Sequence, residues 1–294
     1  MSRNLISYME ESKELIHDGL ISCLEKLDIP DNLKQAMLYS VKAGGKRLRP
    51  VLLFSAFEAY GEDNKKAISS AIALELIHTY SLVHDDLPAM DNDDYRRGKL
   101  TNHKVFGEAT AILAGDALLT YSFELIANDP LLQDGEKVEL IKSLSRASGP
   151  KGMVGGQILD MEAENKATSL TELERIHVLK TGELLQFAVY SGAYLGGAST
   201  TELAALNDFS YYLGLIFQIQ DDILDVTGDS QKMGKQVGSD EGNNKSTYPK
   251  LLGLDGAIEQ KNMYAKKAKE ALKEANAAHS NLMALTDHFS NRDH

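Results

Sequence analysis

The spacing of apolar residues along the chain predicts helices almost throughout. Prolines stand only at positions 30, 50, 88, 130, 150 and 249, so the stretch 151–248 contains none. Within it Leu173, Ile176 and Leu179 recur at the spacing of one helix face. No segment keeps the sustained alternation of a β-strand. The pattern predicts helices near 3–27, 31–42, 50–60, 64–86, 107–127, 136–148, 152–164, 170–195, 200–226 and 256–289.

Local signals mark the starts of several of these helices. Asp31 follows Pro30, and Ser169 precedes Glu172 by three residues, the spacing of a capping box. A further start is expected at Asp255. No Pro/Gly/Ser-rich linker, low-complexity segment or repeat of about 20 to 50 residues divides the chain. We therefore expect residues 1–294 to form one large all-α domain.

Composition narrows the classes of function. With 294 residues and 43% hydrophobic content, the chain can bury a large core. The excess of 43 acidic over 31 basic residues gives a net charge of −12, which argues against general binding to nucleic acid or to anionic membranes. An anionic ligand must therefore meet a local basic cluster or a metal ion.

Cysteine usage and hydropathy indicate a compartment. Cys23 is the single cysteine, which excludes an internal disulfide and a thiolate zinc site and is typical of a reducing environment. Acidic residues come too early at the start for a secretory hydrophobic region, and we find no apolar run of about 20 residues. We expect a cytoplasmic protein without membrane insertion.

Five aspartates crowd the segment HDDLPAMDNDD, which runs from position 84 to 94. Like charges at this density repel unless an ion neutralises them or water solvates them. On a straight helix Asp91 would lie about 120° from Asp85 in projection. Pro88 between them disrupts the helix, so Asp91 can return toward Asp85.

A second acidic cluster lies in FQIQDDILD. Asp221 and Asp225 are four residues apart, a rotation of about 400° that places both carboxylates on one helix face. Neither cluster has enough carboxylates to complete a coordination shell, which suits Mg²⁺ shared with the phosphates of a substrate. Either cluster alone would more readily be a solvated helix end, and the first does not match an EF-hand loop.

Basic residues accompany the acidic clusters. The segment GGKRLRP, at positions 44–50, combines flexible backbone with Lys46, Arg47 and Arg49, which can donate to phosphate oxygens. Alone, it could be a surface loop. Further basic residues follow the two acidic clusters: Arg96 and Arg97 after the first, Lys235 and Lys245 after the second.

His78 lies seven residues before Asp85, about 20° from the same helical stripe. Its side chain is therefore expected to point toward whatever Asp85 faces. A histidine packed in the core is the alternative, and the spacing leaves both interpretations open.

In order and spacing, the motifs resemble the set found in short-chain trans-isoprenyl diphosphate synthases. The matching segments are GGKRLRP, HDDLPAMDNDDYRRGK, GGQILD, KTGEL, FQIQDDILD, and GKQVGSD followed by KSTY. They extend from about position 44 to 248. The longer first aspartate motif is similar to that of the bacterial farnesyl diphosphate synthases in this family.

The resemblance implies the isoprenoid synthase fold: a bundle of about ten or more long helices around a deep central cavity, usually in a homodimer. It places the two aspartate motifs opposite each other across the cavity mouth. It also implies Mg²⁺, as three ions bound with the allylic diphosphate. The implied metal ligands are Asp85, Asp91 and Asp221, with Asp86, Asp222 and Asp225 in support.

The same resemblance assigns the isoprenoid diphosphate substrates. Arg96, Lys180 and Lys235 would hold the allylic diphosphate. Lys46, Arg49, His78 and Arg97 would hold isopentenyl diphosphate, while Thr181 and Gln218 would line the reacting centre. Lys245 is a further substrate-binding residue. Arg292 near the end of the chain either closes over the isopentenyl site or belongs to a frayed tail, which is the expected outcome.

The implied activity is a Mg²⁺-dependent prenyl transfer that makes farnesyl diphosphate. Ser81 lies one helical turn before Asp85 and Tyr80 five residues before it. The resemblance makes Tyr80 and Ser81 the chain-length residues; ordinary interhelical packing is the alternative role for Tyr80. Geranylgeranyl or geranyl diphosphate synthesis remains open within the family. A terpene cyclase, a non-catalytic synthase subunit and a helical scaffold agree less well with two intact aspartate motifs and their basic residues.

Overall fold

The computed structural model describes residues 5–164, 166–227 and 246–292. These residues form helices and one short hairpin, which confirms the all-α prediction. The chain divides into two compact units, Met1–Phe54 with Asp63–Ile141 and Ser55–Glu62 with Lys142–His294. The single domain expected over 1–294 stays a prediction, as does the facing arrangement of the two aspartate motifs, because each motif belongs to a different unit.

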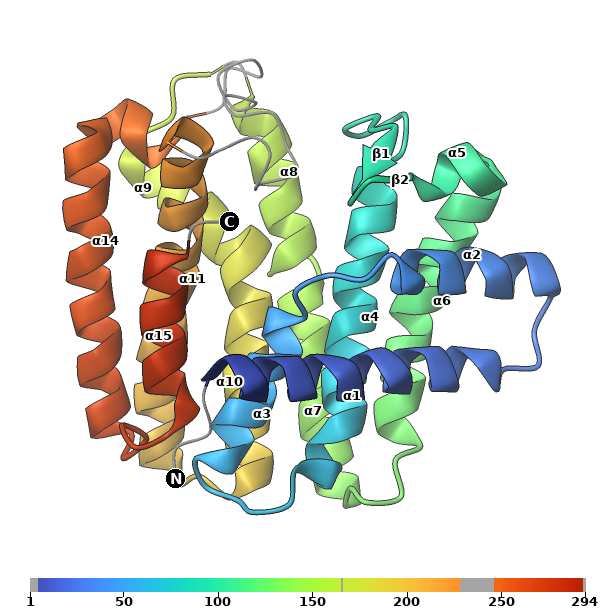
Figure 1. The fold of residues 1–294 in the computed structure, drawn as a ribbon, viewed down its shortest axis with the longest axis horizontal. Helices are drawn as coiled ribbons and strands as arrows, with labels where there is room; N and C mark the ends of the chain where they lie inside the picture. Colours follow the sequence, from blue (N-terminus) through green and yellow to red (C-terminus); the bar gives the residue numbers. More distant parts are fainter. Residues whose placement is uncertain (1–4, 165, 228–245, 293–294) are drawn as a thin grey trace. The chain divides into compact units, whose positions relative to one another are not determined.

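The first unit is centred on a helix that is buried on most of its surface. This helix, α4, packs against α6, while α1 packs against α2 (Figure 1). Leu74, Leu76 and Ile77 of α4 are fully buried, so α4 forms the core of the unit. The elements are α1 (Leu5–Glu25), α2 (Asp31–Lys42), the start of α3 (Leu48–Glu58), the 3₁₀ helix η1 (Asn64–Ala67), α4 (Ile68–Asp85), β1 (Tyr95–Arg96), β2 (Lys99–Leu100), α5 (Asn102–Phe106), α6 (Glu108–Ala127) and the start of α7 (Asp134–Ser148).

The second unit is organised around the long helix α11. It packs against α10, α14 and α15, and Figure 1 shows α14 and α15 running beside it. Its buried side chains include Phe209, Leu213 and Ile216. Besides the ends of α3 and α7, the elements are α8 (Met153–Ala163), α9 (Leu170–His177), the π-helical segment η2 (Val178–Gly182), α10 (Glu183–Gly196), α11 (Thr200–Thr227), α14 (Tyr248–Glu274) and α15 (Asn281–Asn291).

Two predicted helix starts are confirmed. Helix α2 begins at Asp31, directly after Pro30. At α9 the Ser169 hydroxyl accepts a hydrogen bond from the Glu172 N–H, and the Glu172 carboxylate accepts one from the Ser169 N–H, at 3.3 and 2.8 Å. This reciprocal pair is the capping box expected from the sequence.

Other boundaries differ from the prediction. The helix expected at 256–289 is two helices, separated where Asn276 adopts a left-handed φ of 55°. The expected start at Asp255 is wrong, because α14 begins at Tyr248 with Thr247 as its N-cap and is kinked at Gly253, where φ is 73°. The hairpin and α5 were not expected, and the helix expected at 170–195 contains the π-helical segment.

Candidate active site

The first aspartate segment folds back on itself. Helix α4 ends at Asp85, and the Asp91 N–H donates a 2.9 Å hydrogen bond to the Asp85 carbonyl. This confirms the predicted return of the chain beyond Pro88. Asp91 itself is exposed. Its carboxylate is therefore available beside the end of α4.

Asp86 is held by Arg96. The Arg96 Nε and Nη2 atoms lie 2.7 and 2.6 Å from Oδ1 of Asp86, whose side chain is 5% exposed. Burial raises the pKa of Asp86, and Arg96 offsets part of that rise. Because the paired carboxylate is almost fully buried, the contact agrees with a supporting role for Asp86. Arg96 remains a predicted ligand of the allylic diphosphate.

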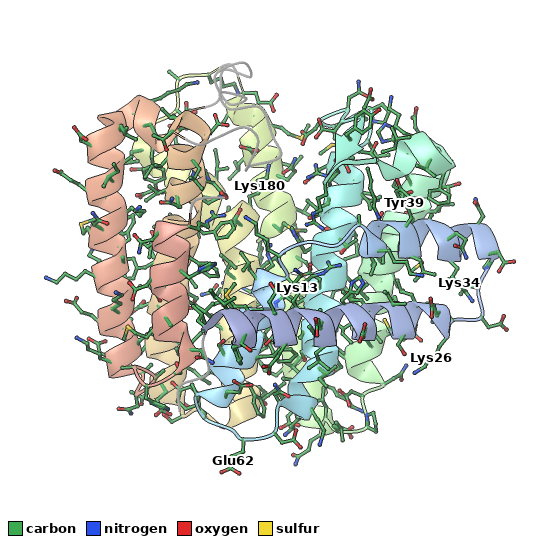
Figure 2. All side chains as sticks on the ribbon, in the orientation of Figure 1. Lys13, Lys26, Lys34, Tyr39, Glu62 and Lys180 are labelled. Atoms are coloured by element: carbon green, nitrogen blue, oxygen red, sulfur yellow. The ribbon has the colours of Figure 1, made fainter. Side chains whose placement is uncertain are left out.

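A tight hairpin places the two consecutive arginines. Tyr95 pairs with Leu100 and Arg96 with Lys99, while Arg97 and Gly98 form the turn with φ values of 53° and 75°. Positive φ at both turn residues is the conformation that closes a two-residue hairpin. The Tyr39 hydroxyl, labelled in Figure 2, donates to the Leu100 carbonyl at 2.7 Å and ties the hairpin to α2.

A basic cluster forms around His78. The Arg97 Nη1 atom donates to the Gly44 carbonyl, so the hairpin contacts the GGKRLRP segment. Burial lowers the pKa of His78 well below its usual value, and Arg49 and Arg97 are the next largest causes. His78 is thus neutral near pH 7, among arginines. Three of the four residues predicted to hold isopentenyl diphosphate lie together, and Lys46 is exposed on the adjoining loop.

Arg47 does not join this cluster as a phosphate donor. Its Nη1 atom lies 2.6 Å from Oε1 of Glu75, with both side chains 2% exposed, and its Nη2 donates to the Val41 carbonyl at 2.7 Å. The sequence interpretation that grouped Arg47 with Lys46 and Arg49 is therefore wrong. A left-handed φ of 51° at Arg47 belongs to the local backbone that turns this side chain inward.

The second aspartate cluster lies on α11. Asp221 and Asp225 share this helix, as predicted, and Asp225 is buried. Asp222 accepts a 2.9 Å hydrogen bond from the backbone N–H of Tyr248, at the start of α14. The backbone of the KSTY segment thus supports the cluster directly.

Arg292 reaches the same cluster. Its Nη2 atom donates to Oδ1 of Asp221 at 2.6 Å and to the Phe217 carbonyl at 2.9 Å. Its own carbonyl accepts a 2.8 Å hydrogen bond from Gln220. The expectation that Arg292 belongs to a frayed tail is wrong, because buried contacts within the second unit anchor it. Closure of Arg292 over the isopentenyl site stays a prediction.

The KTGEL motif spans the end of the π-helical segment η2 and the start of α10. Lys180, labelled in Figure 2, lies 2.6 Å from Oδ2 of Asp160, the last residue of GGQILD. The Thr181 hydroxyl donates to Oε1 of Gln218 at 2.7 Å, and the Gln218 amide lies 3.4 Å from Asp221. The predicted reacting-centre residues thus connect to a predicted metal ligand. Such π-helical turns are frequent at functional sites.

Two residues of GGQILD were quoted in the motif but given no role. A Cβ on Gly156 would lie 2.3 Å from the Lys180 backbone nitrogen, so only glycine lets α8 approach η2 this closely. Asp160 then binds the Lys180 ammonium. The motif itself was the signal that could have identified both.

Lys235 and Lys245 lie outside the described residues.

Each aspartate cluster, taken by itself, offers the oxygen donors that Mg²⁺ prefers. Among the described residues, no group of three or more His, Cys, Asp or Glu side chains is gathered closely enough to hold a metal. Oxygen donors in incomplete sets are what Mg²⁺ uses when substrate phosphates and water supply the remaining ligands. The Asp221 carboxylate is paired with the Arg292 guanidinium, but at 44% exposure it stays open to solvent.

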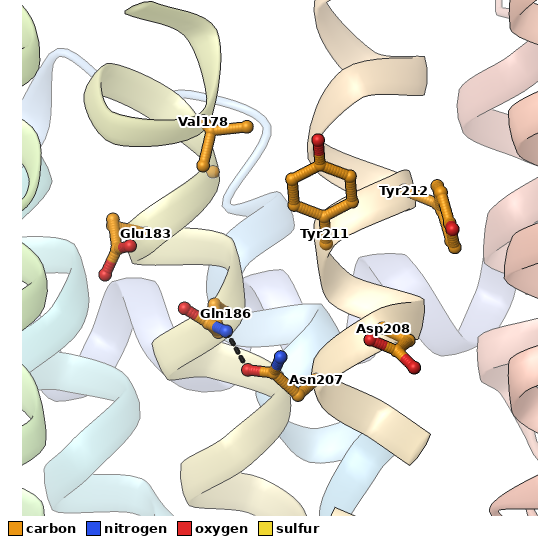
Figure 3. A pocket seen from close by; sticks show the side chains of 8 residues that line it. Val178, Glu183, Gln186, Asn207, Asp208, Tyr211 and Tyr212 are labelled. Carbon is orange, nitrogen blue, oxygen red and sulfur yellow. Dashed lines mark hydrogen bonds between the residues drawn. The ribbon is translucent and has the colours of Figure 1, made fainter. Parts of the chain in front are cut away.

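A cavity of about 320 Å³ opens in the second unit, between the η2–α10 segment and α11 (Figure 3). Gln186 of α10 donates to Asn207 of α11 across it. Burial raises the pKa of Glu183 in its wall. None of the residues assigned to substrates or metal lies in this wall, which consists of Val178, Gly182, Glu183, Gln186, Asn207, Asp208, Tyr211 and Tyr212.

The predicted chain-length residues lie on α4. Tyr80 is 6% exposed, and Ile77 one turn earlier is fully buried. The pKa of Tyr80 is raised to about 12. Burial is the largest cause, and the negative charge of Asp85 is the second. The Ser81 hydroxyl donates to the His78 carbonyl at 3.0 Å. Tyr80 is therefore the bulky buried group below the first aspartate motif.

Comparison with known proteins identifies the class. Residues 30–285 match the polyprenyl synthetase family, and the chain belongs to that family. It is 50% identical to farnesyl diphosphate synthase of Geobacillus stearothermophilus, over 98% of this chain and 97% of that one. It is 42% identical to geranylgeranyl diphosphate synthase of Cyanophora paradoxa, over 99% and 97% of the two chains. The solved structure of an FPP/GFPP synthase from Zymomonas mobilis matches with a TM-score of 0.85 and 35% identity, over 98% of this chain and 100% of that one.

Proposed function

We propose that this protein is a farnesyl diphosphate synthase. It condenses isopentenyl diphosphate with dimethylallyl diphosphate and then with geranyl diphosphate, and releases pyrophosphate at each step. The near full-length similarity to farnesyl diphosphate synthases supports this product over the longer ones. Geranylgeranyl or geranyl diphosphate synthesis is the alternative within the family.

One structural observation supports diphosphate chemistry most directly. Helix α4 carries Asp85 at its end and His78 two turns earlier, and His78 is surrounded by arginines. Carboxylates that can bind Mg²⁺ and cations that can bind a phosphate thus both lie beside the second half of α4, within the first unit. A helical scaffold without a diphosphate ligand would have no use for this cluster.

Asp85, Asp91 and Asp221 are the proposed metal ligands, for three Mg²⁺ ions bound with the allylic diphosphate. Bound Mg²⁺ supplies Lewis-acid stabilisation of the negative charge that develops on the departing pyrophosphate. Arg96 binds Asp86 and the Tyr248 N–H binds Asp222, and these two aspartates position the neighbouring ligands. Asp225 supports the second cluster from one helical turn beyond Asp221.

The basic residues divide between the two substrates. Arg96, Lys180 and Lys235 hold the allylic diphosphate, whose C1–oxygen bond breaks with its electron pair leaving on pyrophosphate. The second set holds isopentenyl diphosphate so that its double bond attacks the resulting C1 cation: Lys46, Arg49, His78 and Arg97. Lys245 is a further diphosphate ligand.

Thr181 and Gln218 stabilise the allylic cation. Their hydrogen bond fixes two polar side chains on neighbouring elements, so their oxygen dipoles can face the cationic carbon. Water must be excluded, because it would convert the cation to an alcohol. A proton lost from the adduct restores the double bond. The departing pyrophosphate is the proposed base, because the motifs contain no dedicated one.

We also propose a cytoplasmic homodimer without membrane insertion. In the described part of the chain, α6 is the one helix long and apolar enough to cross a membrane, and a soluble protein's helix can pass the same test. It exposes Ile112 and Leu113 at 43% and 59%. An exposed apolar face of this kind suits contact with a second copy.

Transfer of labelled isopentenyl diphosphate tests the proposal. The purified protein, with Mg²⁺ and an allylic starter, should form a longer linear diphosphate, and excess EDTA should abolish the reaction. A hydrocarbon product would identify a cyclase. No product would favour a non-catalytic subunit, and full turnover in excess EDTA would contradict the metal-dependent mechanism.

A further inference from the structure

The ring of Tyr80 is in contact with one aromatic neighbour on its own helix. His84, one turn later on α4, meets it edge to face, with ring centroids 5.6 Å apart and planes at 83°. Tyr80 is buried, and the His84 side chain is 27% exposed. The imidazole and the Tyr80 ring are thus in direct edge-to-face contact.

Helix α6 fixes the His84 ring in turn. The His84 Nε2 atom lies 3.0 Å from the Ile112 carbonyl oxygen and 3.9 Å from Oδ1 of Asp116. A Cβ added to Gly115 would lie 2.1 Å from Nε2 and 2.4 Å from Cδ2 of His84. The imidazole thus packs directly on the Gly115 backbone. Any side chain at position 115 would therefore force the His84 ring to move.

We propose that His84 and Gly115 are positioning residues that hold the Tyr80 ring in place and so limit the length of the product. The inference rests on the proposed function and on Tyr80 as the floor met by the growing chain. Gly115 admits the His84 ring, the Ile112 carbonyl orients it, and the ring blocks rotation of Tyr80. Removing the imidazole gives Tyr80 room to move aside for a longer chain.

The product distribution tests this directly, because a purely structural role would lower stability without lengthening the product. The dephosphorylated alcohols of wild type, Tyr80→Ala, His84→Ala and His84→Gln are compared at equal total conversion. His84→Ala should raise the ratio of C20 to C15 product by about two- to tenfold, the range expected from losing one edge-to-face ring contact. His84→Gln keeps an amide N–H for the Ile112 carbonyl but also loses the ring, so its product should shift in the same direction as that of His84→Ala.

A stability cycle tests the contact with α6. Gly115→Ala should lower Tm, because the new methyl group displaces the His84 ring. Adding His84→Ala to that variant should recover part of the lost Tm, since the clash partner is gone. Gly135→Ala is the matched control, because a Cβ there meets nothing within 4 Å. Equal Tm changes with and without His84 would overturn the proposed contact.

The outcomes separate the inference from the proposed function. A His84→Ala enzyme that still stops at C15, while Tyr80→Ala runs longer, overturns the positioning role. Unchanged products in both variants overturn it as well, and leave prenyl transfer intact. A wild-type protein that transfers no prenyl unit removes the proposed function and the inference together.

Discussion

The guanidinium of Arg292 pairs with Asp221 at 2.6 Å, so the last described residue of the chain binds a carboxylate proposed to ligate Mg²⁺. The guanidinium also stacks over the Phe217 ring, with Cζ 4.0 Å from the centroid. The Arg292 side chain is 6% exposed and that of Asp221 is 44% exposed. The pair is thus sheltered on the arginine side and open to solvent on the aspartate side.

Arg292→Gln should therefore lower the free Mg²⁺ concentration needed for half-maximal activity. Removing a positive charge from Asp221 frees its carboxylate, and the partial exposure of the pair limits the effect to about two- to tenfold. Activity measured against buffered Mg²⁺ checks this. Lys269→Gln, which removes a 2.5 Å pair with Asp287, is the control with no expected change. An increased Mg²⁺ requirement would show that Arg292 orients the ligand instead of competing for it.

Substitutions should separate the two diphosphate sites. Arg49→Gln should raise KM for isopentenyl diphosphate more than for geranyl diphosphate, and Lys180→Gln should do the reverse. Losing one charged hydrogen bond to a phosphate costs about 1.5–3 kcal/mol, or roughly 10- to 150-fold. Steady-state kinetics with each substrate varied in turn measures both constants. Lys65→Gln, at an exposed ion pair with Asp63, is the control. Equal effects on both substrates would refute the division.

Arg47 should affect folding more than substrate binding. Removing one partner of a buried ion pair leaves the other charge without compensation, so Arg47→Met should destabilise the protein by about 3–5 kcal/mol. The double variant Arg47→Met/Glu75→Leu should be less destabilised, because both charges are gone. Chemical denaturation measures the three free energies of unfolding. A stable Arg47→Met protein with a raised KM for isopentenyl diphosphate would instead make Arg47 a phosphate ligand.

Acid should destabilise the protein through His177. Burial lowers its pKa from 6.5 to about 4. The unfolded chain therefore takes up a proton as the pH falls below about 6.5, while folded His177 stays neutral until about pH 4. Stability is lost across that window, by at most about 3 kcal/mol from this group.

His177→Phe tests the effect with little change in packing. The His177 ring stacks on Tyr248 with centroids 5.9 Å apart, which phenylalanine can preserve, and its buried Nε2 has no hydrogen-bond partner among the described residues. The variant should lose less stability than wild type between pH 6.5 and pH 4. Part of the loss of stability with falling pH should remain in the variant, because burial also lowers the pKa of His78. If the variant loses as much stability as wild type between pH 6.5 and pH 4, His177 does not cause the acid destabilisation.

The sequence predicted those features that depend on local rules. Helix period, the Ser169 capping box and the return of the chain beyond Pro88 all follow from neighbours within about one or two turns. The division of 256–289 into two helices was missed, because it depends on the left-handed backbone conformation of Asn276, which the residue type alone does not require.

Side-chain partners far apart in the sequence could not be predicted in this way. The sequence of GGKRLRP does not distinguish Arg47 from Arg49. The buried carboxylate of Glu75, 28 residues further along the chain, forms an ion pair with Arg47. The Arg292 contact with Asp221 likewise spans 71 residues. Motif resemblance supplied Lys180 and Thr181, whereas the role of Asp160 required the Lys180 contact to be seen.

Product chain length tests the central claim most directly. The purified protein is incubated with Mg²⁺, dimethylallyl diphosphate and excess isopentenyl diphosphate, and the products are dephosphorylated and separated by chromatography. The account predicts farnesol as the main alcohol, with geraniol as a transient intermediate. Geranylgeraniol as the main alcohol, or no prenyl alcohol at all, would contradict it.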